Sequence, residues 1–503
     1  MRTLRLVLPL VLWLTGSWQT LRAADPPSRA EVTAALQRAT QFLTSQVADH
    51  GGYKWVASAD GKFGNGEGVA PPGTIWVQPP GTPAVGMAFL EAYEATGDPI
   101  HLKAAEAAAM ALVRGQLRSG GWNYRIEFTL QRRREFIYRD GPGGSRDDIP
   151  ETPSPGGWDV WRQRKFKGDI TVLDDDTTPS ALRLLMRVDQ ALAFSNRAIH
   201  EAVHYALEST SNAQHPGGAW SHNYDRFPLQ PPSAEHYPVL KASYPTNWSR
   251  TWTKDFTGGY ALNDRITQNM IATMLLAYRI YEDERYLASA KRGGDFLLAA
   301  QMPDPQPAWA QQYNRQMQPV WDRKFEPPAI SGLESQDVLE TLLLLYRETG
   351  DRRYLEPIPR ALAYLKSCEL PGGRIARFYE LQTNRPLYFT KDYQLTYDSR
   401  DVPEHYGFSF PSRLAAIEAQ YRKLLETPAD KLREEPAPAV TPELVQSVQK
   451  LLASQRADGA WLEPGEVRDP SGRKVRPPEG VVHSQTFINN VQTLCRYLAA
   501  LPL

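Results

Sequence analysis

The sequence predicts an all-α protein whose helix hairpins form an α/α toroid, and three observations support this. Apolar residues recur at helical spacing in about twelve stretches, which is the pattern of amphipathic helices. The stretches come in pairs, and about six pairs follow one another along the 503 residues, as in repeat proteins. Repeated helix hairpins either stack as an open solenoid or close into a ring. Unequal loop lengths and single-domain size favour the ring, with long loops and short β-hairpins at its mouth.

Each pair has a first and a second helix. In the earliest pair Leu36, Ala39, Phe42 and Leu43 share one helix face, which is the spacing of a buried stripe. First helices are expected near residues 32–43, 101–116, 197–209, 285–301, 352–367 and 441–454. Second helices are expected near residues 82–96, 177–194, 265–281, 333–348, 409–424 and 484–500.

A loop containing glycine or tryptophan follows the first helix of each pair. The loops are Gly51-Gly52-Tyr53, Gly120-Gly121-Trp122, Gly217-Gly218-Ala219-Trp220, Pro307-Ala308-Trp309, Pro371-Gly372-Gly373 and Gly459-Ala460-Trp461. Because these loops leave the same end of successive hairpins, we expect them, and the chemistry, on one face of the protein.

Composition divides the chain into four segments. Residues 1–24 combine arginines, an apolar run of about ten residues and small residues at a cleavage point, which is typical of a signal peptide. A signal anchor is the alternative, although the run is short for a membrane span. Residues 25–425 are expected to form the catalytic toroid and 426–440 a proline-rich connector. Residues 441–503 are expected to form a C-terminal helix pair that closes the ring.

Charge and cysteine content narrow the class of protein. The chain has 57 basic and 57 acidic side chains, a balance that does not suit a nucleic-acid-binding protein. We expect a monomer that is secreted or periplasmic, with no membrane span in the mature chain. Cys368 and Cys495 could form a disulfide in an exported protein, and two buried thiols are the alternative.

Acidic residues stand just before two consecutive second helices. Asp174-Asp175-Asp176 precedes the helix expected at 177–194, and Asn263-Asp264 occupies the matching point of the next pair. Adjacent carboxylates repel one another, and a hard cation such as Ca²⁺ compensates them. We therefore predict Asp174, Asp175 and Asp264 as calcium ligands. The alternative is that they cap helix N-termini, where aspartate is also favoured.

Aromatic and amide side chains form a second candidate set. Trp309, Gln312 and Tyr313 precede the Arg323-Lys324 pair. Aromatic faces cover sugar C–H groups and amides bind hydroxyls, so we predict that these three residues and Trp220 bind sugar. The alternative is that the aromatic residues face the core. A third set from Phe378 to Tyr388 is rich in polar aromatics and cations, and its alternative role is to brace the ring.

Several common catalytic motifs are absent from the sequence. It contains no phosphate-binding glycine loop, no CxxC and no Gly-x-Ser-x-Gly. His215, His222 and His236 lack zinc-site spacing. Carboxylates of the Asp174–Asp176 run and Asp264 could also pair for glycoside hydrolysis. A glycoside hydrolase on a related α/α toroid is therefore an alternative, as is a non-catalytic toroid that binds acidic polysaccharide.

Six blocks in this order resemble the pectate lyases of polysaccharide lyase family ten. The blocks are Leu173-Asp174-Asp175-Asp176, Gly217-Gly218-Ala219-Trp220, Leu262-Asn263-Asp264, Trp309 to Tyr313, Asp322 to Gly332, and Tyr379 to Pro386. The resemblance covers about residues 170–410. It departs from the family pattern at Ala219 and Ser221, at the second and third aspartates of the Asp run, and at Pro403-Glu404-His405, where the family has a basic cluster.

The resemblance implies an activity and roles for particular residues. It implies an α/α toroid that cleaves pectate (polygalacturonate) by Ca²⁺-assisted β-elimination. Arg323 matches the arginine that acts as the base at C5, which requires neighbouring cations to lower its pKa because arginine is otherwise always protonated. Asp174 or Asp175 would hold the metal with Asp264 nearby, and Arg385 and Lys391 would bind neighbouring uronates.

Overall fold

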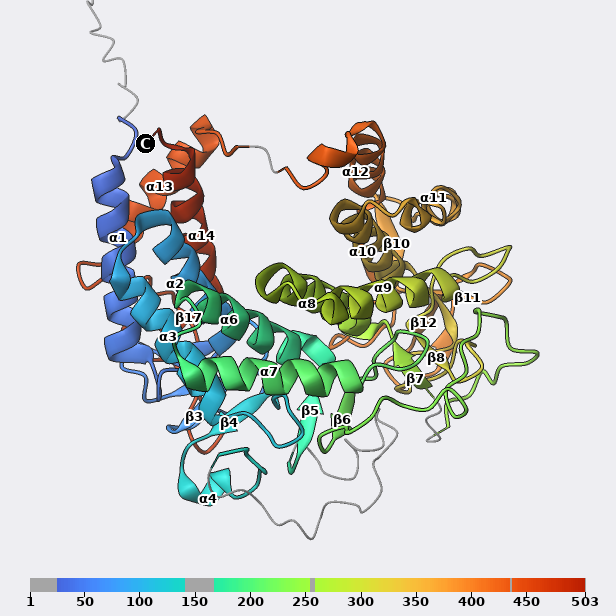
Figure 1. Ribbon diagram of the computed structural model, residues 1–503, viewed down its shortest axis with the longest axis horizontal. Coiled ribbons are helices and arrows are strands. Elements are labelled where there is room, and N and C mark those ends of the chain that lie inside the picture. The colour runs from blue at the N-terminus through green and yellow to red at the C-terminus, as the bar shows by residue number, and fades with distance from the viewer. Residues whose placement is uncertain (1–24, 141–166, 254–257, 435–436, 503) are drawn as a thin grey trace, which may run out of the picture.

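The computed structural model describes residues 25–140, 167–253, 258–434 and 437–502. Within these residues, twelve long helices alternate between an outer and an inner position (Figure 1). The outer helices are α1 (Arg29–Phe42), α3 (Pro99–Arg114), α7 (Arg197–Asn212), α9 (Glu284–Ala299), α11 (Ile358–Ser367) and α13 (Pro442–Ser454). The inner helices are α2 (Thr82–Thr96), α6 (Thr177–Ala191), α8 (Ile266–Tyr281), α10 (Gly332–Thr349), α12 (Leu414–Glu426) and α14 (Ser484–Ala500).

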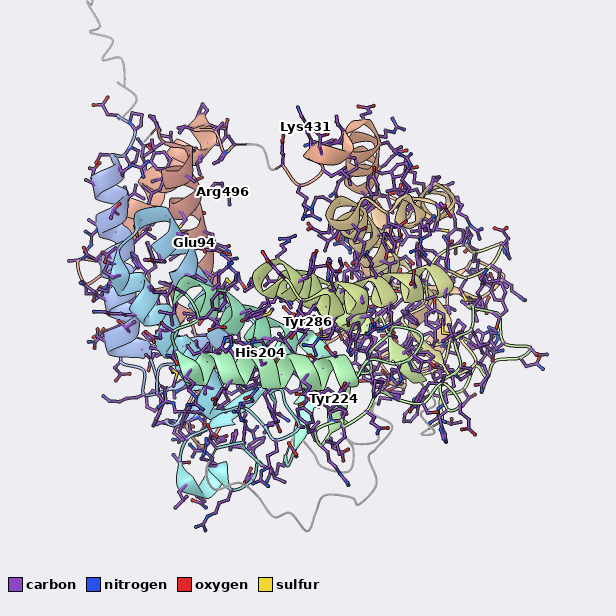
Figure 2. All side chains as sticks on the ribbon, in the orientation of Figure 1. Glu94, His204, Tyr224, Tyr286, Lys431 and Arg496 are labelled. Atoms are coloured by element: carbon purple, nitrogen blue, oxygen red, sulfur yellow. The ribbon has the colours of Figure 1, made fainter. Side chains whose placement is uncertain are left out.

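The inner helices contact one another in series around an arc. The order of contact is α14, α2, α6, α8, α10 and α12, and outer helices pack on them as α3 on α2, α7 on α6 and α9 on α8. Helix α1 also packs on α14, which joins the two ends of the chain. The predicted all-α, α/α-toroid class is confirmed. Figure 1 shows that the arc is open between α12 and α14, and Figure 2 places Lys431 and Arg496 on the two sides of that opening.

Short antiparallel strand pairs link the helix hairpins at one end. The strand before an inner helix pairs with the strand after the following outer helix. This holds for β3 (Thr74–Trp76) with β4 (Arg125–Glu127), β5 (Ile170–Val172) with β6 (Asn223–Asp225), β7 (Gly258–Ala261) with β8 (Gln312–Asn314), and β9 (Ala329–Ser331) with β11 (Phe378–Glu380). The same link between β1 (Val56–Ser58) and β17 (Val481–His483) connects the two ends of the chain.

Further short strands lie at the same end of the helix hairpins. Strand β1 also pairs with β2 (Gly64–Asn65), and β10 (Arg374–Ala376) pairs with β14 (Ser409–Pro411). Strand β12 (Pro386–Phe389) lies between β11 and β13 (Leu395–Thr396), while β15 (Val467–Arg468) pairs with β16 (Lys474–Val475). A short helix, α4 (Leu130–Arg133), follows β4. The sequence expectation of short β-hairpins around a helical ring is therefore met.

Local sequence signals set the ends of the helices. Ser28 and Glu31 form a capping box at the start of α1, and Asp98 caps α3 just before Pro99. Gly97 and Gly350 end α2 and α10 with φ angles of 72° and 70°. That left-handed conformation favours glycine because a side chain there is strained.

Three tryptophans in the loops after the outer helices connect neighbouring helix pairs through hydrogen bonds. Trp122, Trp220 and Trp309 are each 0% exposed. Their indole N–H groups donate at 2.8 Å to backbone carbonyls of the preceding outer helix, those of Leu112, Thr210 and Leu297. Their backbone N–H groups donate to hydroxyls of the next inner helix, those of Thr178, Thr267 and Ser335. Each loop therefore ties an outer helix to the inner helix that follows it.

Other sequence expectations concern the cysteines and the membrane. Cys368 and Cys495 are both free and buried. No helix in the described parts of the chain combines the length and the apolar character that crossing a bilayer requires. The predicted signal peptide lies outside the described residues.

Candidate metal and substrate site

Two equivalent turns precede the inner helices α6 and α8. The first acidic turn is Asp174–Asp176, and the second acidic turn is Asn263–Arg265. In both turns the last two residues have left-handed φ angles: 51° and 58° at Asp175 and Asp176, and 45° and 62° at Asp264 and Arg265. Consecutive non-glycine residues in this conformation are strained, which is a feature of functional sites.

Helix capping does not explain these residues. Asp176 and Arg265 occupy the N-cap positions of α6 and α8, and neither side chain makes a capping hydrogen bond. Instead, Asp176 pairs with Arg183 at 2.5 Å, and Arg265 pairs with Asp337 at 2.7 Å. The other side chains of the two turns are therefore available for another role.

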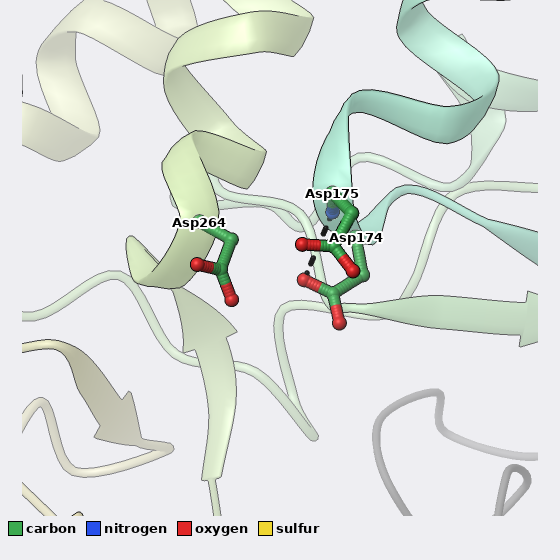
Figure 3. A group of neighbouring side chains, drawn as sticks. All are labelled: Asp174, Asp175 and Asp264. Carbon is green, nitrogen blue, oxygen red and sulfur yellow. Dashed lines mark hydrogen bonds between the residues drawn. The ribbon is translucent and has the colours of Figure 1, made fainter. Parts of the chain in front are cut away.

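The turns bring three carboxylates together (Figure 3). One oxygen from each of Asp174, Asp175 and Asp264 lies within 4.8 Å of the other two. Asp174 is buried, and Asp175 and Asp264 are half-buried. Three anionic oxygen donors at this spacing suit a hard divalent cation, which prefers carboxylate ligands. The donor set thus fits the Ca²⁺ site expected from the sequence.

Burial and mutual repulsion disfavour the charged form of these acids. Burial raises the pKa of Asp174 well above its usual value, and Asp175 and Asp264 raise it further. Burial and then the Glu67 carboxylate raise the pKa of Asp175. Burial and then Asp175 raise the pKa of Asp264 to about 6. A cation at this position would relieve the repulsion, and Arg323 already opposes the rise at all three acids.

Residues two positions after the buried tryptophans surround the acids. The Tyr124 hydroxyl lies 3.4 Å from Asp174 Oδ2 and donates at 3.2 Å to Asp175 Oδ2. Gln311 Nε2 donates to Asn263 Oδ1, and Asn263 Nδ2 donates at 2.8 Å to Asp264 Oδ2. These bonds orient the carboxylates, as outer hydrogen bonds do around metal ligands.

The backbones of two residues in these loops hold the turns themselves. The carbonyl of His222 accepts from the N–H groups of Leu173 and Asp174 at 2.8 and 3.2 Å. The carbonyl of Gln311 accepts from Leu262 and Asn263 at 2.9 and 3.0 Å. His222 and Gln311 follow Trp220 and Trp309 by two residues. The hydrogen bonds that hold each buried tryptophan in place therefore also help to set the position of an acidic turn.

A cationic cluster lies beside the acids. Arg323 forms a bidentate pair with the fully buried Glu326, at 2.6 Å from Nε and 2.5 Å from NH2. The Tyr406 hydroxyl donates at 2.7 Å to the same carboxylate. Arg377 stacks on Tyr406 with its guanidinium carbon 4.3 Å from the ring centre, and pairs with Glu334 at 3.1 Å. The guanidinium carbon of Arg323 lies 5.4 Å from the centre of the same ring, so the two arginines share it.

The structure does not give Arg323 the surroundings of a base. Burial lowers the pKa of Arg323, but the charge and hydrogen bonds of Glu326 outweigh burial and the net pKa is raised. The same pair overcomes the effect of burial on Glu326 and lowers its pKa to about 2. The sequence expectation required cations that lower the pKa of Arg323, and that expectation is wrong, because a carboxylate occupies the position.

Several predicted sugar-binding residues lie in the core. Trp220, Trp309 and Tyr313 are each 0% exposed, and the Tyr313 hydroxyl donates at 2.7 Å to the Ala300 carbonyl. The prediction that these rings contact substrate is wrong, because both faces of each ring are covered. Gln312 is 2% exposed, and its amide has no hydrogen-bond partner in the described part of the chain.

Two predicted substrate-binding cations do lie at the surface. The guanidinium of Arg385 stacks on the Tyr397 ring at 3.3 Å from its centre. Lys391 is exposed, and its Nζ atom lies 3.8 Å from Glu404, which is also exposed. Both remain predictions as uronate-binding residues.

The sequence analysis missed most of the residues around the acids. Tyr124, His222 and Gln311 could have been found, because each follows a buried loop tryptophan by two residues. Glu326 stands three residues after Arg323, the spacing of a local ion pair. Arg377 and Tyr406 carry no local signal, since only the fold brings them to Arg323.

Comparisons with known proteins give distant structural likenesses. No family profile and no curated protein matches the sequence. A variant of a family 10 polysaccharide lyase from Cellvibrio cellulosa, solved with trigalacturonic acid, is 17% identical with a TM-score of 0.43, and the match covers 67% of this chain and 98% of that one. Cellobiose 2-epimerase from Bacillus thermoamylovorans is 11% identical with a TM-score of 0.45, covering 94% and 100%.

A third solved structure belongs to yet another reaction class. An α-1,6-mannanase variant from Salegentibacter, solved with α-1,6-mannotriose, is 12% identical with a TM-score of 0.39, covering 94% of this chain and 99% of that one. The three proteins are a lyase, an epimerase and a mannanase. At these identities and TM-scores they assign no activity to this chain.

Proposed function

We propose that this protein is a secreted lyase that cleaves an acidic polysaccharide, polygalacturonate, by calcium-assisted β-elimination. The observation that carries the proposal is the convergence of Asp174, Asp175 and Asp264 within electrostatic reach of Arg323. A cation site beside an arginine can stabilise the charge that develops on a uronate carboxylate during β-elimination. The resemblance of six sequence blocks to family ten pectate lyases supports the same reading.

In this proposal the acids hold the cation and the arginines face the substrate. Asp174, Asp175 and Asp264 would bind Ca²⁺, which withdraws electron density through the uronate carboxylate and makes the C5 proton more acidic. Tyr124 and Asn263 keep the ligand oxygens oriented. Solvent hydroxide takes the C5 proton, and the C5–H electron pair forms the C4=C5 double bond. The C4–O4 bond breaks, O4 leaves with a proton from water, and a 4,5-unsaturated uronate remains.

The role of Arg323 follows from its pairing with Glu326. The resemblance makes Arg323 the base, but its raised pKa favours a protonated guanidinium. We therefore propose that Arg323 stabilises the negative charge that develops on the uronate carboxylate as the C5 proton leaves, a role that needs a fixed cation. If Arg323 were the base, log kcat/KM would rise by one unit per pH unit up to the pKa of Arg323.

We expect Arg323→Ala to lower turnover by about 10³-fold, as the loss of a transition-state contact does. Affinity for trigalacturonate should change by less than about threefold. Steady-state kinetics and calorimetric titration measure the two quantities. A parallel loss of affinity and turnover would assign Arg323 to ground-state binding.

The activity itself is tested by absorbance in the near ultraviolet. The unsaturated product absorbs there, so the purified protein with polygalacturonate and Ca²⁺ should give a rising signal that EDTA abolishes. Arg323→Ala serves as the control for a contaminating lyase. No absorbance change with any uronate polymer would contradict the proposal.

One observation favours a second candidate, a glycoside hydrolase. The raised pKa of Asp264, about 6, is suited to a general acid. A hydrolase would release reducing ends without ultraviolet absorbance and would not need a divalent cation. Binding of the polysaccharide with neither product would favour a non-catalytic role.

A further inference from the structure

A segment of the long loop after β6 is hydrogen-bonded to the residues next to the cationic cluster. We call residues 248–252 the strap. The Trp252 indole N–H donates at 2.7 Å to the carbonyl of Asp322, and the Trp321 indole N–H donates at 2.7 Å to the carbonyl of Ser249. These reciprocal bonds fasten the strap to the residues that immediately precede Arg323.

The strap is held at a third point. Arg250 donates at 2.7 Å to the Tyr397 hydroxyl and pairs with the buried Glu380. The Arg250 side chain nevertheless stays 56% exposed. The strap therefore presents a fixed, solvent-facing cation close to its tryptophans.

The three tryptophans of this region differ in how their rings are packed. Trp321 packs on Phe389 with ring centres 6.0 Å apart and belongs to the edge of a small apolar cluster that includes Phe325 and Phe408. Trp248 packs against the same cluster and the main core. Trp252 is half-buried, and among the described residues its ring joins none of the apolar clusters.

We propose that the Trp252 ring is the surface on which a sugar residue of the substrate stacks, one subsite away from the bond that is cleaved. The inference rests on the proposed function. The indole N–H fixes the ring through Asp322, whose neighbour Arg323 lies at the acidic site. The ring thus has a defined orientation and is partly accessible to solvent.

The chemistry of a uronate matches this arrangement. One face of the pyranose ring presents C–H groups, which an indole covers well, and the carboxylate at its edge needs a cation. Arg250 supplies an exposed guanidinium on the same strap. A tryptophan whose ring is already fixed binds a sugar with little further loss of side-chain entropy. Trp252 thus takes the stacking role that the sequence analysis assigned to the buried Trp220 and Trp309.

The proposal predicts a loss of binding without a loss of chemistry. Trp252→Ala should raise KM for polygalacturonate about tenfold while kcat changes less than threefold, because stacking acts on bound substrate before and during reaction alike. Trp252→Phe keeps an aromatic face and should restore most of the KM. The melting temperature of Trp252→Ala should stay close to that of the wild type, because the ring is outside the core.

A matched control uses an exposed aromatic ring far from the site. Phe194 is 43% exposed and follows the opposite end of α6 from the first acidic turn. Phe194→Ala should leave KM unchanged. Trigalacturonate binding should be measured by calorimetry with each Trp252 variant in the Arg323→Ala background, which separates affinity from turnover.

Each outcome decides the inference. A wild-type protein that forms the unsaturated product, with a Trp252→Ala variant of equal KM and equal trigalacturonate affinity, overturns the role of Trp252 and leaves the proposed function intact. A large fall in the melting temperature of Trp252→Ala also overturns it, because the ring would then be structural. A wild-type protein that neither binds trigalacturonate nor cleaves polygalacturonate overturns both proposals.

Discussion

The first and second acidic turns share one backbone and carry different side chains. Each is held by a carbonyl two residues after a buried tryptophan, and each ends in two left-handed residues. At the first position Asp174 is matched by Asn263, and at the third Asp176 is matched by Arg265. Only the second position, Asp175 and Asp264, is acidic in both turns.

This difference shows that the repeat determines the backbone of each turn, whereas the side chains determine its chemistry. The hairpin repeat supplies the strained turn twice, and it sets the distance between the turns through the packing of α6 on α8. The side chains then distribute charge unequally, with three acids in the first turn and one acid and one arginine in the second. We infer that the shared second position is the basis of the metal site.

The largest expected effect is at that shared position. Asp175→Asn and Asp264→Asn should each lower calcium-dependent turnover by about 100-fold or more. The reason is that the metal site takes a carboxylate ligand from the second position of each turn. Asn263→Ala, which removes only the bond that orients Asp264, should cost about tenfold. Initial rates measured across a Ca²⁺ series test the ranking. Equal effects at Asn263 and Asp264 would break the comparison.

Giving the second turn the first-position acid of the first turn should destabilise the protein. Asn263→Asp adds a carboxylate beside Asp264 and replaces its hydrogen-bond donor with an anion. Without Ca²⁺, we expect the free energy of unfolding to fall by about 1–3 kcal/mol, the cost of a buried unpaired group. Denaturant unfolding in EDTA measures this change, and added Ca²⁺ should recover part of it. An unchanged stability in EDTA would show that a second carboxylate beside Asp264 carries no cost.

The raised pKa values predict an unusual dependence of stability on pH. The folded protein binds a proton at Asp264 up to a pH of about 6, whereas the unfolded chain releases it near 3.8. Stability without Ca²⁺ should therefore be highest below pH 4 with respect to this group, and it should fall as pH rises to 6. The expected loss is about 1–3 kcal/mol, since one pKa unit corresponds to about 1.4 kcal/mol and the group is partly exposed.

Denaturant unfolding in EDTA at several pH values checks this direction. Asp264→Asn is the matched control, because it removes the titrating group and should flatten the profile between pH 4 and 6. Saturating Ca²⁺ should oppose the trend, since the metal competes with protons for the same oxygens. A change in stability between pH 4 and 6 that is the same in the wild type and in Asp264→Asn, measured in EDTA, would contradict the pKa shift.

The smallest effect is expected at the third position of each turn. Asp176 and Arg265 pair with Arg183 and Asp337 in partly exposed ion pairs. Arg265→Ala should change the free energy of unfolding by about 0–1 kcal/mol, as such pairs do. Calcium dependence of the rate should not move. A shifted Ca²⁺ requirement would place the third position in the metal site.

Much of the helical framework could be predicted from the sequence. Apolar spacing located all twelve long helices, as in 82–96 for α2 and 484–500 for α14, because one buried face is a local property of each helix. Gly97 and Gly350, which end α2 and α10, are local signals of the same kind. Asp174, Asp175 and Asp264 were found because their places in the repeat match.

The burial of side chains could not be predicted in the same way. A tryptophan beside two glutamines, as at Trp309, Gln311 and Gln312, occurs both in sugar-binding sites and in loops that are buried in the core. Only tertiary packing distinguishes the two cases. The pairing of Arg323 with Glu326 and the approach of Tyr406 and Arg377 join distant segments. Trp220 is fully buried and Trp252 is half-buried, and only tertiary packing distinguishes the two.

The most direct test of the account is a calorimetric titration of the full protein with Ca²⁺. We predict one site with a Kd in the range of about 10⁻⁵–10⁻³ M, and no measurable binding when both Asp175 and Asp264 are replaced by asparagine. A wild-type protein that does not bind Ca²⁺ at millimolar concentration, or a double variant that binds as tightly as the wild type, would contradict the account.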